Sequence, residues 1–181
     1  GAPVMWKTVH SPLKQKMYEI GSPLGGELGS HLFIGEVYYG FDDAPLVALR
    51  TLEIIARSGK SISELFEDIP KLVATPEIIL SAPDSLKFAI IDEISAELAK
   101  DYEVFTLDGV RASFEDGWGL VRASNTQPAI TLRFEAHSPA GVVTNMQHFK
   151  ALMDKYPEID QTKFVEQIEK FKAMGAGASG H

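Results

Sequence analysis

The sequence predicts an α+β fold in two pieces, because helical and strand patterns occur in both halves of the chain. In the second half, residues 130–136 alternate Ile, Leu and Phe with Thr, Arg and Glu, the period of a strand with one face on a core. In the first half, apolar residues after position 43 recur at helical spacing. Pro70 and Pro76 bracket the segment between the halves, which we interpret as a linker, with short proline-flanked strands as the alternative.

The first part of the chain begins with a strand pattern and a helix pattern. We expect a strand at residues 3–8 and a short helix at residues 11–19. Gly21 ends this helix, because glycine and the proline that follows it disfavour further helical turns. A glycine-rich loop then leads into a short apolar strand at residues 32–34.

Two further helices are predicted before the linker. Asp42 or Asp43 can cap the first of them, which runs to Arg57. The second helix, at residues 61–66, begins with Ser-Ile-Ser-Glu, a capping-box pattern. We therefore interpret the paired carboxylates as helix caps, and metal binding or acid–base chemistry is the alternative.

The second part of the chain has a strand-rich centre between helices. Strands are expected at residues 77–81, 102–107, 110–114, 119–121 and 130–136, and helices at residues 87–98, 142–156 and 162–174. On the first of these helices one face carries Phe88, Ile91, Ile94 and Leu98. Residues 175–181 are mostly glycine and small side chains, which predicts a flexible tail.

Composition restricts the classes of function. The chain has 181 residues, 45% of them hydrophobic, a formal net charge of −8 and no cysteine. Disulfides, thiolate metal sites and cysteine nucleophiles are therefore excluded. The negative charge disfavours nucleic-acid and anionic-membrane partners. No apolar run approaches the roughly 20 residues of a membrane span and no signal peptide is recognised, so we expect a cytoplasmic protein.

A polar loop at residues 121–128 is the strongest functional signal. Arg122 supplies a fixed positive charge, and Ser124, Asn125 and Thr126 supply hydrogen-bonding side chains before a proline closes the loop. A guanidinium can hold two oxygens of a phosphate while hydroxyl and backbone N–H groups bind the third. Because Ser, Asn and Thr are also common turn residues, an ordinary polar hairpin turn is the alternative.

Four short motifs, in this order along the chain, resemble those of the α-D-phosphohexomutases of the bacterial phosphomannomutase/phosphoglucomutase type. They are Trp-Lys-Thr-Val-His-Ser at 6–11, Gly-Glu-Leu-Gly-Ser-His at 26–31, Tyr-Gly-Phe-Asp-Asp-Ala at 39–44 and Arg-Ala-Ser-Asn-Thr-Gln-Pro at 122–128. Asp-Gly-Val-Arg at 108–111 and Gly-Trp-Gly at 117–119 precede the last motif. The resemblance covers residues 2 to 150, most of the chain.

The resemblance implies a truncated sugar-recognition domain at residues 1–72, a partial mixed α/β third domain, followed by a C-terminal phosphate-binding domain at residues 73–174. The C-terminal domain is expected to pack helices on an antiparallel sheet, as in TATA-box-binding protein. The family's catalytic serine and metal loop are not recognised in this sequence. We therefore expect the missing N-terminal domains of the same enzyme to be the partner of this chain, and the chain alone to be inactive.

The activity that the resemblance implies is the interconversion of hexose 1-phosphate and hexose 6-phosphate, with mannose and glucose as the sugars. It proceeds through a phosphoserine and a hexose 1,6-bisphosphate, which is both intermediate and activator, with Mg²⁺ bound outside this chain. Such an enzyme is an isomerase and phosphotransferase of carbohydrate metabolism. The alternatives are a non-catalytic phosphosugar-binding module and a relative of the phosphoglucosamine mutases.

The resemblance assigns the phosphate to the loop residues already named and the sugar to Glu27, Ser30 and His31. The usual order Glu-x-Ser-Gly-His is Glu-Leu-Gly-Ser-His here, which moves the serine hydroxyl by one position. Lys7 and His10 are candidates for supporting roles in phosphate contact or proton transfer, and ordinary exposed side chains are the alternative. No metal ligand is expected on this chain.

Overall fold

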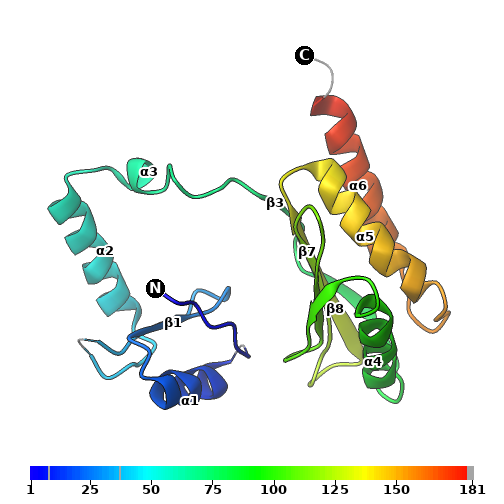
Figure 1. Ribbon diagram of the computed structural model, residues 1–181, viewed down its shortest axis with the longest axis horizontal. Coiled ribbons are helices and arrows are strands. Elements are labelled where there is room, and N and C mark those ends of the chain that lie inside the picture. Colours follow the sequence, from blue (N-terminus) through cyan, green and yellow to red (C-terminus); the bar gives the residue numbers. More distant parts are fainter. Residues whose placement is uncertain (8, 37, 179–181) are drawn as a thin grey trace. The chain divides into compact units, whose positions relative to one another are not determined.

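The computed structural model describes residues 1–7, 9–36 and 38–178. The chain divides into two compact units, Gly1–Pro70 and Lys71–His181 (Figure 1). Part of the segment interpreted as a linker, β3 at Val73–Ala74, pairs with a strand of the second unit. The proline-flanked strand, the alternative for this segment, is therefore what forms. Within the part of the chain that is described, each helix is too short or too polar to cross a membrane.

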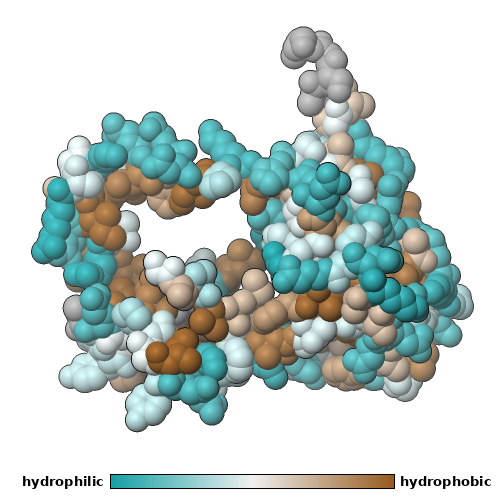
Figure 2. Space-filling view, viewed as in Figure 1, coloured by the Kyte–Doolittle hydropathy of each residue, from teal (hydrophilic) through white to brown (hydrophobic). Residues whose placement is uncertain are grey.

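The described part of the first unit holds a small antiparallel hairpin and three helices, two of which bury no residue. Its elements are α1 His10–Ile20, β1 Leu24–Gly26, β2 Leu32–Ile34, α2 Ala44–Ser58 and α3 Ile62–Leu65. β1 and β2 pair with Leu24 opposite Ile34. Phe33, the middle residue of β2, is fully buried. Apolar side chains on α2 stay exposed, including Leu49 and Leu52, and brown surface follows this helix in Figure 2.

The predicted helix ends of the first unit are confirmed, each with its local cause. α1 ends at Gly21, whose φ of 62° is the left-handed conformation that glycine adopts without strain. The side chain of Asp43 accepts a hydrogen bond from the Leu46 N–H at 2.9 Å at the start of α2. Ser61 and Glu64 form the capping box of α3.

The strand expected at residues 3–8 is the main error in the first unit. Described residues 3–7 form no strand, and Thr8 lies outside the described residues. A strand needs a hydrogen-bonded neighbour as well as a suitable sequence, and here the hairpin partner of β2 is β1. The pattern of β1 is Leu-Gly-Gly, which lacks the β-branched and aromatic residues that signal a strand, so this strand was not predicted.

The second unit is an antiparallel sheet with helices. Its elements are β3, β4 Ile78–Ser81, α4 Lys87–Leu98, β5 Glu103–Phe105, β6 Val110–Ser113, β7 Trp118–Ala123, β8 Ala129–Ala136, α5 Pro139–Met153 and α6 Thr162–Ala178. The strand order is β3-β8-β7-β6-β5, and β4 also pairs with β8. All pairs are antiparallel, so the α+β class and the antiparallel sheet predicted for this half are confirmed.

One face of this sheet packs against α4 and α5, which lie beside β7 and β8 in Figure 1. Val121, Leu132 and Phe134 point into the resulting core and are fully buried. Burial of such side chains stabilises the unit by about 1.5–3 kcal/mol each. The core therefore supports the rigid β7–β8 hairpin that carries residues 122–128 at its end.

One helix face and several element boundaries in the second unit differ from the predictions. Phe88 is 52% exposed, because the inward face of α4 starts at Lys87 and continues through Ile90 and Ile91. α5 starts three residues early, because Ser138 caps it by accepting from the Gly141 N–H at 3.0 Å. α6 continues through Ala178, so residues 175–178 of the expected flexible tail are helical, and residues 179–181 lie outside the described residues.

Candidate functional site

The side chain of Arg122 stands at the end of β7, between two carboxylates. Its Nη1 lies 3.4 Å from Oδ2 of Asp108, and its Nη2 lies 3.8 Å from Oε1 of Glu77. Both distances exceed the 2.7–2.9 Å that is usual for strong charge-assisted hydrogen bonds. The Arg122 side chain is 36% exposed. The carboxylates thus orient the guanidinium while part of it still faces solvent.

Gly109 allows Asp108 to approach Arg122. Its φ is +76°, and a Cβ at this position would lie 2.3 Å from the Val121 carbonyl oxygen and 2.6 Å from the Cβ of Arg122. Any larger residue would have to push the turn away from β7. The glycine therefore fixes the distance between the Asp108 carboxylate and the guanidinium.

Ser124 organises the turn between β7 and β8. Its Oγ accepts hydrogen bonds from the N–H groups of Thr126 at 3.3 Å and Gln127 at 3.1 Å. Its own N–H donates to the Ala129 carbonyl at 2.9 Å. Asn125 and Thr126 are exposed. The four residues predicted to bind phosphate thus lie together, three of them on one turn, and Ser124 also holds that turn in shape.

Lys87 is a residue of this site that the sequence did not reveal. It is the first residue of α4, only 4% exposed, and its Nζ donates to the Gln127 carbonyl at 2.8 Å and to Oδ1 of Asp84 at 2.6 Å. A lysine at the start of an amphipathic helix is usually solvated, and its bond to residue 127 spans 40 positions of sequence. No local pattern could therefore have indicated that α4 anchors the turn.

A second cluster lies in the first unit, around Glu27. Oε1 of Glu27 lies 2.5 Å from Nδ1 of His31, and its Oε2 accepts the Val9 N–H at 3.0 Å. The hydrogen bond from the Val9 backbone, followed by that from His31, lowers the pKa of Glu27 below its usual range. The rings of His10 and His31 are 4.4 Å apart. Glu27, His31 and His10, all named from the sequence, are thus brought together.

Asp42 joins this cluster, although it was interpreted as a helix cap. Its Oδ2 lies 3.6 Å from Nε2 of His10 and 3.8 Å from Nε2 of His31. The cap is made by Asp43 alone, since Asp43 is the residue that accepts from the helix N-terminus. The adjacent carboxylate of Asp42 is therefore free of the helix end and faces the imidazoles.

The altered order of the glycine-rich loop has a backbone consequence. Ser30 has a φ of 67° and Val9 a φ of 81°, both in the region that favours glycine. Two backbone hydrogen bonds, both of 3.1 Å, close the loop. The Glu27 N–H donates to the His31 carbonyl, and the Ser30 N–H donates to the Glu27 carbonyl. The exposed Ser30 side chain belongs to this loop but not to the imidazole–carboxylate cluster.

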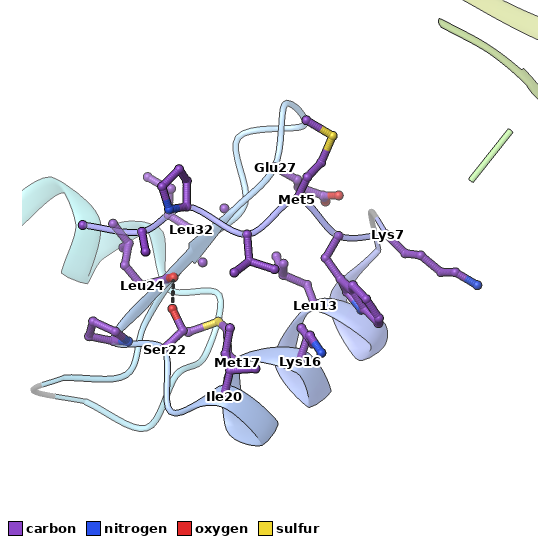
Figure 3. A pocket seen from close by; sticks show the side chains of 18 residues that line it. Met5, Lys7, Leu13, Lys16, Met17, Ile20, Ser22, Leu24, Glu27 and Leu32 are labelled. Atoms are coloured by element: carbon purple, nitrogen blue, oxygen red, sulfur yellow. Dashed lines mark hydrogen bonds between the residues drawn. The ribbon is translucent and has the colours of Figure 1, made fainter. Parts of the chain in front are cut away.

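Lys7 is not brought into this cluster. It lines a hollow of about 770 Å³ whose other lining residues include Val4, Leu24 and Leu32, with Glu27 at the edge. Figure 3 shows the Lys7 side chain leading away from the hollow. Trp6 instead stacks over Lys16, whose Nζ is 4.4 Å from the ring centroid.

Most of the chain is similar to two domains of one known protein family. Residues 77–152 match the family described as phosphoglucomutase/phosphomannomutase, C-terminal domain, and residues 1–73 match its alpha/beta/alpha domain III. A phosphomannomutase/phosphoglucomutase of Pseudomonas putida is 47% identical over 141 residues, which is 77% of this chain and 30% of the relative. A phosphoglucomutase of Neisseria gonorrhoeae is 38% identical over 162 residues, 88% of this chain and 35% of the relative.

A solved structure agrees with these matches. A phosphoglucomutase/phosphomannomutase family protein from Burkholderia thailandensis superposes with a TM-score of 0.74 at 40% identity, covering 84% of this chain and 32% of that one. A phosphoglucosamine mutase of Methanococcus maripaludis is 37% identical over 124 residues, 67% of this chain and 27% of the relative. The chain spans about a third of the length of the curated relatives that it matches.

Proposed function

The chain belongs to the phosphoglucomutase/phosphomannomutase family, of which it holds domain III in part and the C-terminal domain, and we propose that it positions a hexose phosphate for interconversion between the 1-phosphate and the 6-phosphate. The phosphoserine that donates the phosphoryl group and the bisphosphorylated intermediate formed from it belong to the longer enzyme. This chain alone transfers no phosphoryl group. The second unit is proposed to have the TATA-box-binding-protein-like arrangement.

The observation that carries the phosphate half of the proposal is the β7–β8 turn. Arg122 presents an oriented, partly solvated guanidinium near the end of β7. Asn125 and Thr126, in the turn that follows this strand, expose polar side chains. A guanidinium binds two phosphate oxygens in parallel, and hydroxyl and amide groups satisfy the rest. In a chain of net charge −8, such a site needs its positive charge held in place locally, as Asp108 and Glu77 do for the guanidinium. Lys87 holds the turn itself, through the Gln127 carbonyl.

The sugar half rests on the cluster in the first unit. The Glu27 carboxylate, kept ionised by its hydrogen bonds, can accept from two neighbouring sugar hydroxyls. His31 and His10 lie beside it and can donate or accept according to their protonation. Ser30 and Lys7 are proposed to contact the substrate only in the longer enzyme.

Family membership implies Mg²⁺ in the full-length enzymes. Among the described residues, the group that could hold a metal is His10, Glu27 and His31. Two of its three donors are imidazoles, whereas Mg²⁺ takes oxygen ligands. These residues therefore do not fit Mg²⁺. Its role in neutralising charge during phosphoryl transfer is assigned to the rest of the enzyme.

A second candidate substrate is an amino-sugar phosphate. One relative is a phosphoglucosamine mutase, and two carboxylates, those of Glu27 and Asp42, flank His31. Carboxylates can pair with an ammonium group as well as with hydroxyls. Binding of this chain to neutral sugar phosphates should therefore be compared with its binding to amino-sugar phosphates.

Backbone-amide NMR titration of the chain tests the proposal. Glucose 1-phosphate, mannose 1-phosphate, glucosamine 6-phosphate and inorganic phosphate should all shift residues 122–126, and the sugars alone should also shift residues 27–31. Arg122→Gln should abolish the first set of shifts. The matched control Arg57→Gln removes a guanidinium that is 80% exposed and ion-paired with Glu53, and it should change nothing. Absence of shifts with every ligand at millimolar concentration would contradict the proposal.

A further inference from the structure

We propose that His10, Glu27 and His31 form a binding site for a divalent transition metal such as Zn²⁺, and that a metal there blocks the atoms assigned to the sugar. The blocking rests on the proposed function, whereas the metal binding does not. One ligand atom from each of the three residues lies within 4.8 Å of the other two. Such a site is distinct from the Mg²⁺ of the family in both its place and its donors.

The spacing of the donors suits one small ion. Bond lengths of 2.0–2.1 Å in a tetrahedral zinc site place neighbouring ligand atoms about 3.3 Å apart. His31 Nδ1 and Glu27 Oε1 are closer, at 2.5 Å, since they share a hydrogen bond in the metal-free state. An ion that replaces this hydrogen bond needs the two atoms to separate by about 0.8 Å. A rotation of the exposed imidazole is enough for such a shift.

Carboxylates flank His31 at both ring nitrogens. Nδ1 faces Glu27, and Nε2 lies 3.8 Å from Oδ2 of Asp42. Whichever nitrogen binds the metal, the other one faces a carboxylate that fixes the ring orientation and strengthens the ligand. His10 Nε2 is 3.6 Å from the same Asp42 oxygen. Asp42 is therefore either a fourth ligand or the group that orients the two imidazoles.

The ligands are held in place before any metal arrives. The Val9 N–H fixes the second oxygen of Glu27 at 3.0 Å, and the side chain of Glu27 is only 13% exposed. The ring of His10 packs edge-on against the fully buried Phe33, with centroids 5.4 Å apart. Binding then loses less side-chain entropy than it would for three free surface residues.

The donor set selects the kind of metal. Imidazole nitrogens suit Zn²⁺, Cu²⁺ and Ni²⁺, whereas Mg²⁺ and Ca²⁺ are bound by oxygen. The partial exposure of His10 and His31, 46% and 41%, leaves room for water to complete the coordination. We expect one Zn²⁺ to bind at this site.

The test is Zn²⁺ binding to the 181-residue chain by calorimetry, without sugar or phosphate. Wild type should bind one ion, and His31→Ala and Glu27→Gln should weaken binding at least about tenfold. The matched control is His137→Gln, because His137 Nδ1 also lies beside a carboxylate, Asp116 Oδ1 at 2.7 Å, but belongs to the other unit. It should bind Zn²⁺ as wild type does. Equal losses in the control and site variants, or no saturable binding by wild type, would overturn the proposal.

Two further measurements separate the possible failures. Co²⁺ added to wild type should give the visible absorption of a four- or five-coordinate nitrogen-ligated ion, which needs no variant to fold; an octahedral aqua-ion spectrum overturns the site. Zn²⁺ should also remove the sugar-induced shifts at residues 27–31 and leave the phosphate-induced shifts at residues 122–126. If Zn²⁺ binds but the sugar shifts persist, the blocking is wrong. If no sugar shifts occur even without Zn²⁺, the proposed function fails and the metal site stands.

Discussion

Replacing Lys87 with methionine tests whether the buried amine holds the turn that is proposed to bind phosphate. Methionine keeps the length and apolar stem of lysine but removes the donor that reaches the Gln127 carbonyl at 2.8 Å and Asp84 at 2.6 Å. A hydrogen bond from a charged group contributes about 1.5–3 kcal/mol, and the relieved burial of an ammonium that is 4% exposed offsets part of it. We expect the second unit to lose about 1–2 kcal/mol of its free energy of unfolding.

The matched control is Lys100→Met, just beyond the C-terminal end of the same helix. Lys100 also forms an i,i+3 ion pair, with Glu97 at 2.7 Å, but its side chain is 63% exposed. Exposed pairs contribute little, so this variant should unfold as wild type does. Urea denaturation followed by fluorescence compares the two variants in a Trp6→Phe background, where Trp118 of the second unit is the remaining tryptophan.

A local readout distinguishes anchoring from general destabilisation. In Lys87→Met, amide hydrogen exchange should speed up most at residues 124–127, and inorganic phosphate should bind about three- to tenfold more weakly. Lys87→Arg should restore part of the affinity, since a guanidinium can also donate to the carbonyl. Equal stability of Lys87→Met and Lys100→Met, or exchange that rises evenly over the unit, would refute the anchoring role.

Three further outcomes are expected. Val9→Gly should raise the melting temperature of the first unit, because a φ of 81° with a ψ of 140° costs a residue other than glycine about 1–3 kcal/mol; a lower melting temperature would contradict this. Gly109→Ala should lower the free energy of unfolding of the second unit by about 2–4 kcal/mol, because its new Cβ meets Val121 and Arg122. The control Gly59→Ala, with a φ of +66° and open space around it, should lower that of the first unit by only about 1 kcal/mol. Urea denaturation measures both. Burial and a hydrogen bond to Glu93 raise the pKa of Tyr156 to about 12. Its contribution to stability is therefore complete below the unfolded value of 10.0 and is lost as pH rises through 12. A hydrogen bond to Asp43 also raises the pKa of Tyr38, so absorbance titration at alkaline pH should show a late-ionising tyrosine that Tyr156→Phe removes, and a late phase unchanged in that variant would refute the assignment.

Much of the site was readable because its residues are close in sequence. The last residues of β7 and the turn after it hold Arg122, Ser124 and Thr126, so the hairpin brings them together once β7 and β8 pair. Glu27 and His31 are four residues apart in a loop closed by its own backbone hydrogen bonds. In both places local geometry carries the arrangement, and a sequence motif is sufficient to indicate it.

Other parts depend on contacts between segments that are far apart in sequence. Lys87 reaches residue 127, and Asp42 turns from the helix end toward His10 and His31. Nothing near these residues in sequence distinguishes a solvated lysine from a buried one, or a capping aspartate from its neighbour. The strand expected at residues 3–8 failed for the same reason, since a strand pattern does not specify a partner.

The sequence by itself determined the two-part α+β organisation, the helix ends of the first unit and the residue types of the turn that is proposed to bind phosphate, because periodicity, caps and turn chemistry are local. The tertiary structure decided which charges surround each site. Two carboxylates from other segments, those of Asp108 and Glu77, reach Arg122. A third segment brings Lys87 to the backbone of the turn, and Asp42 reaches the imidazole of His31 in the first unit. Electrostatic interactions depend on distance in space, and distance in space is set by the packing of the core.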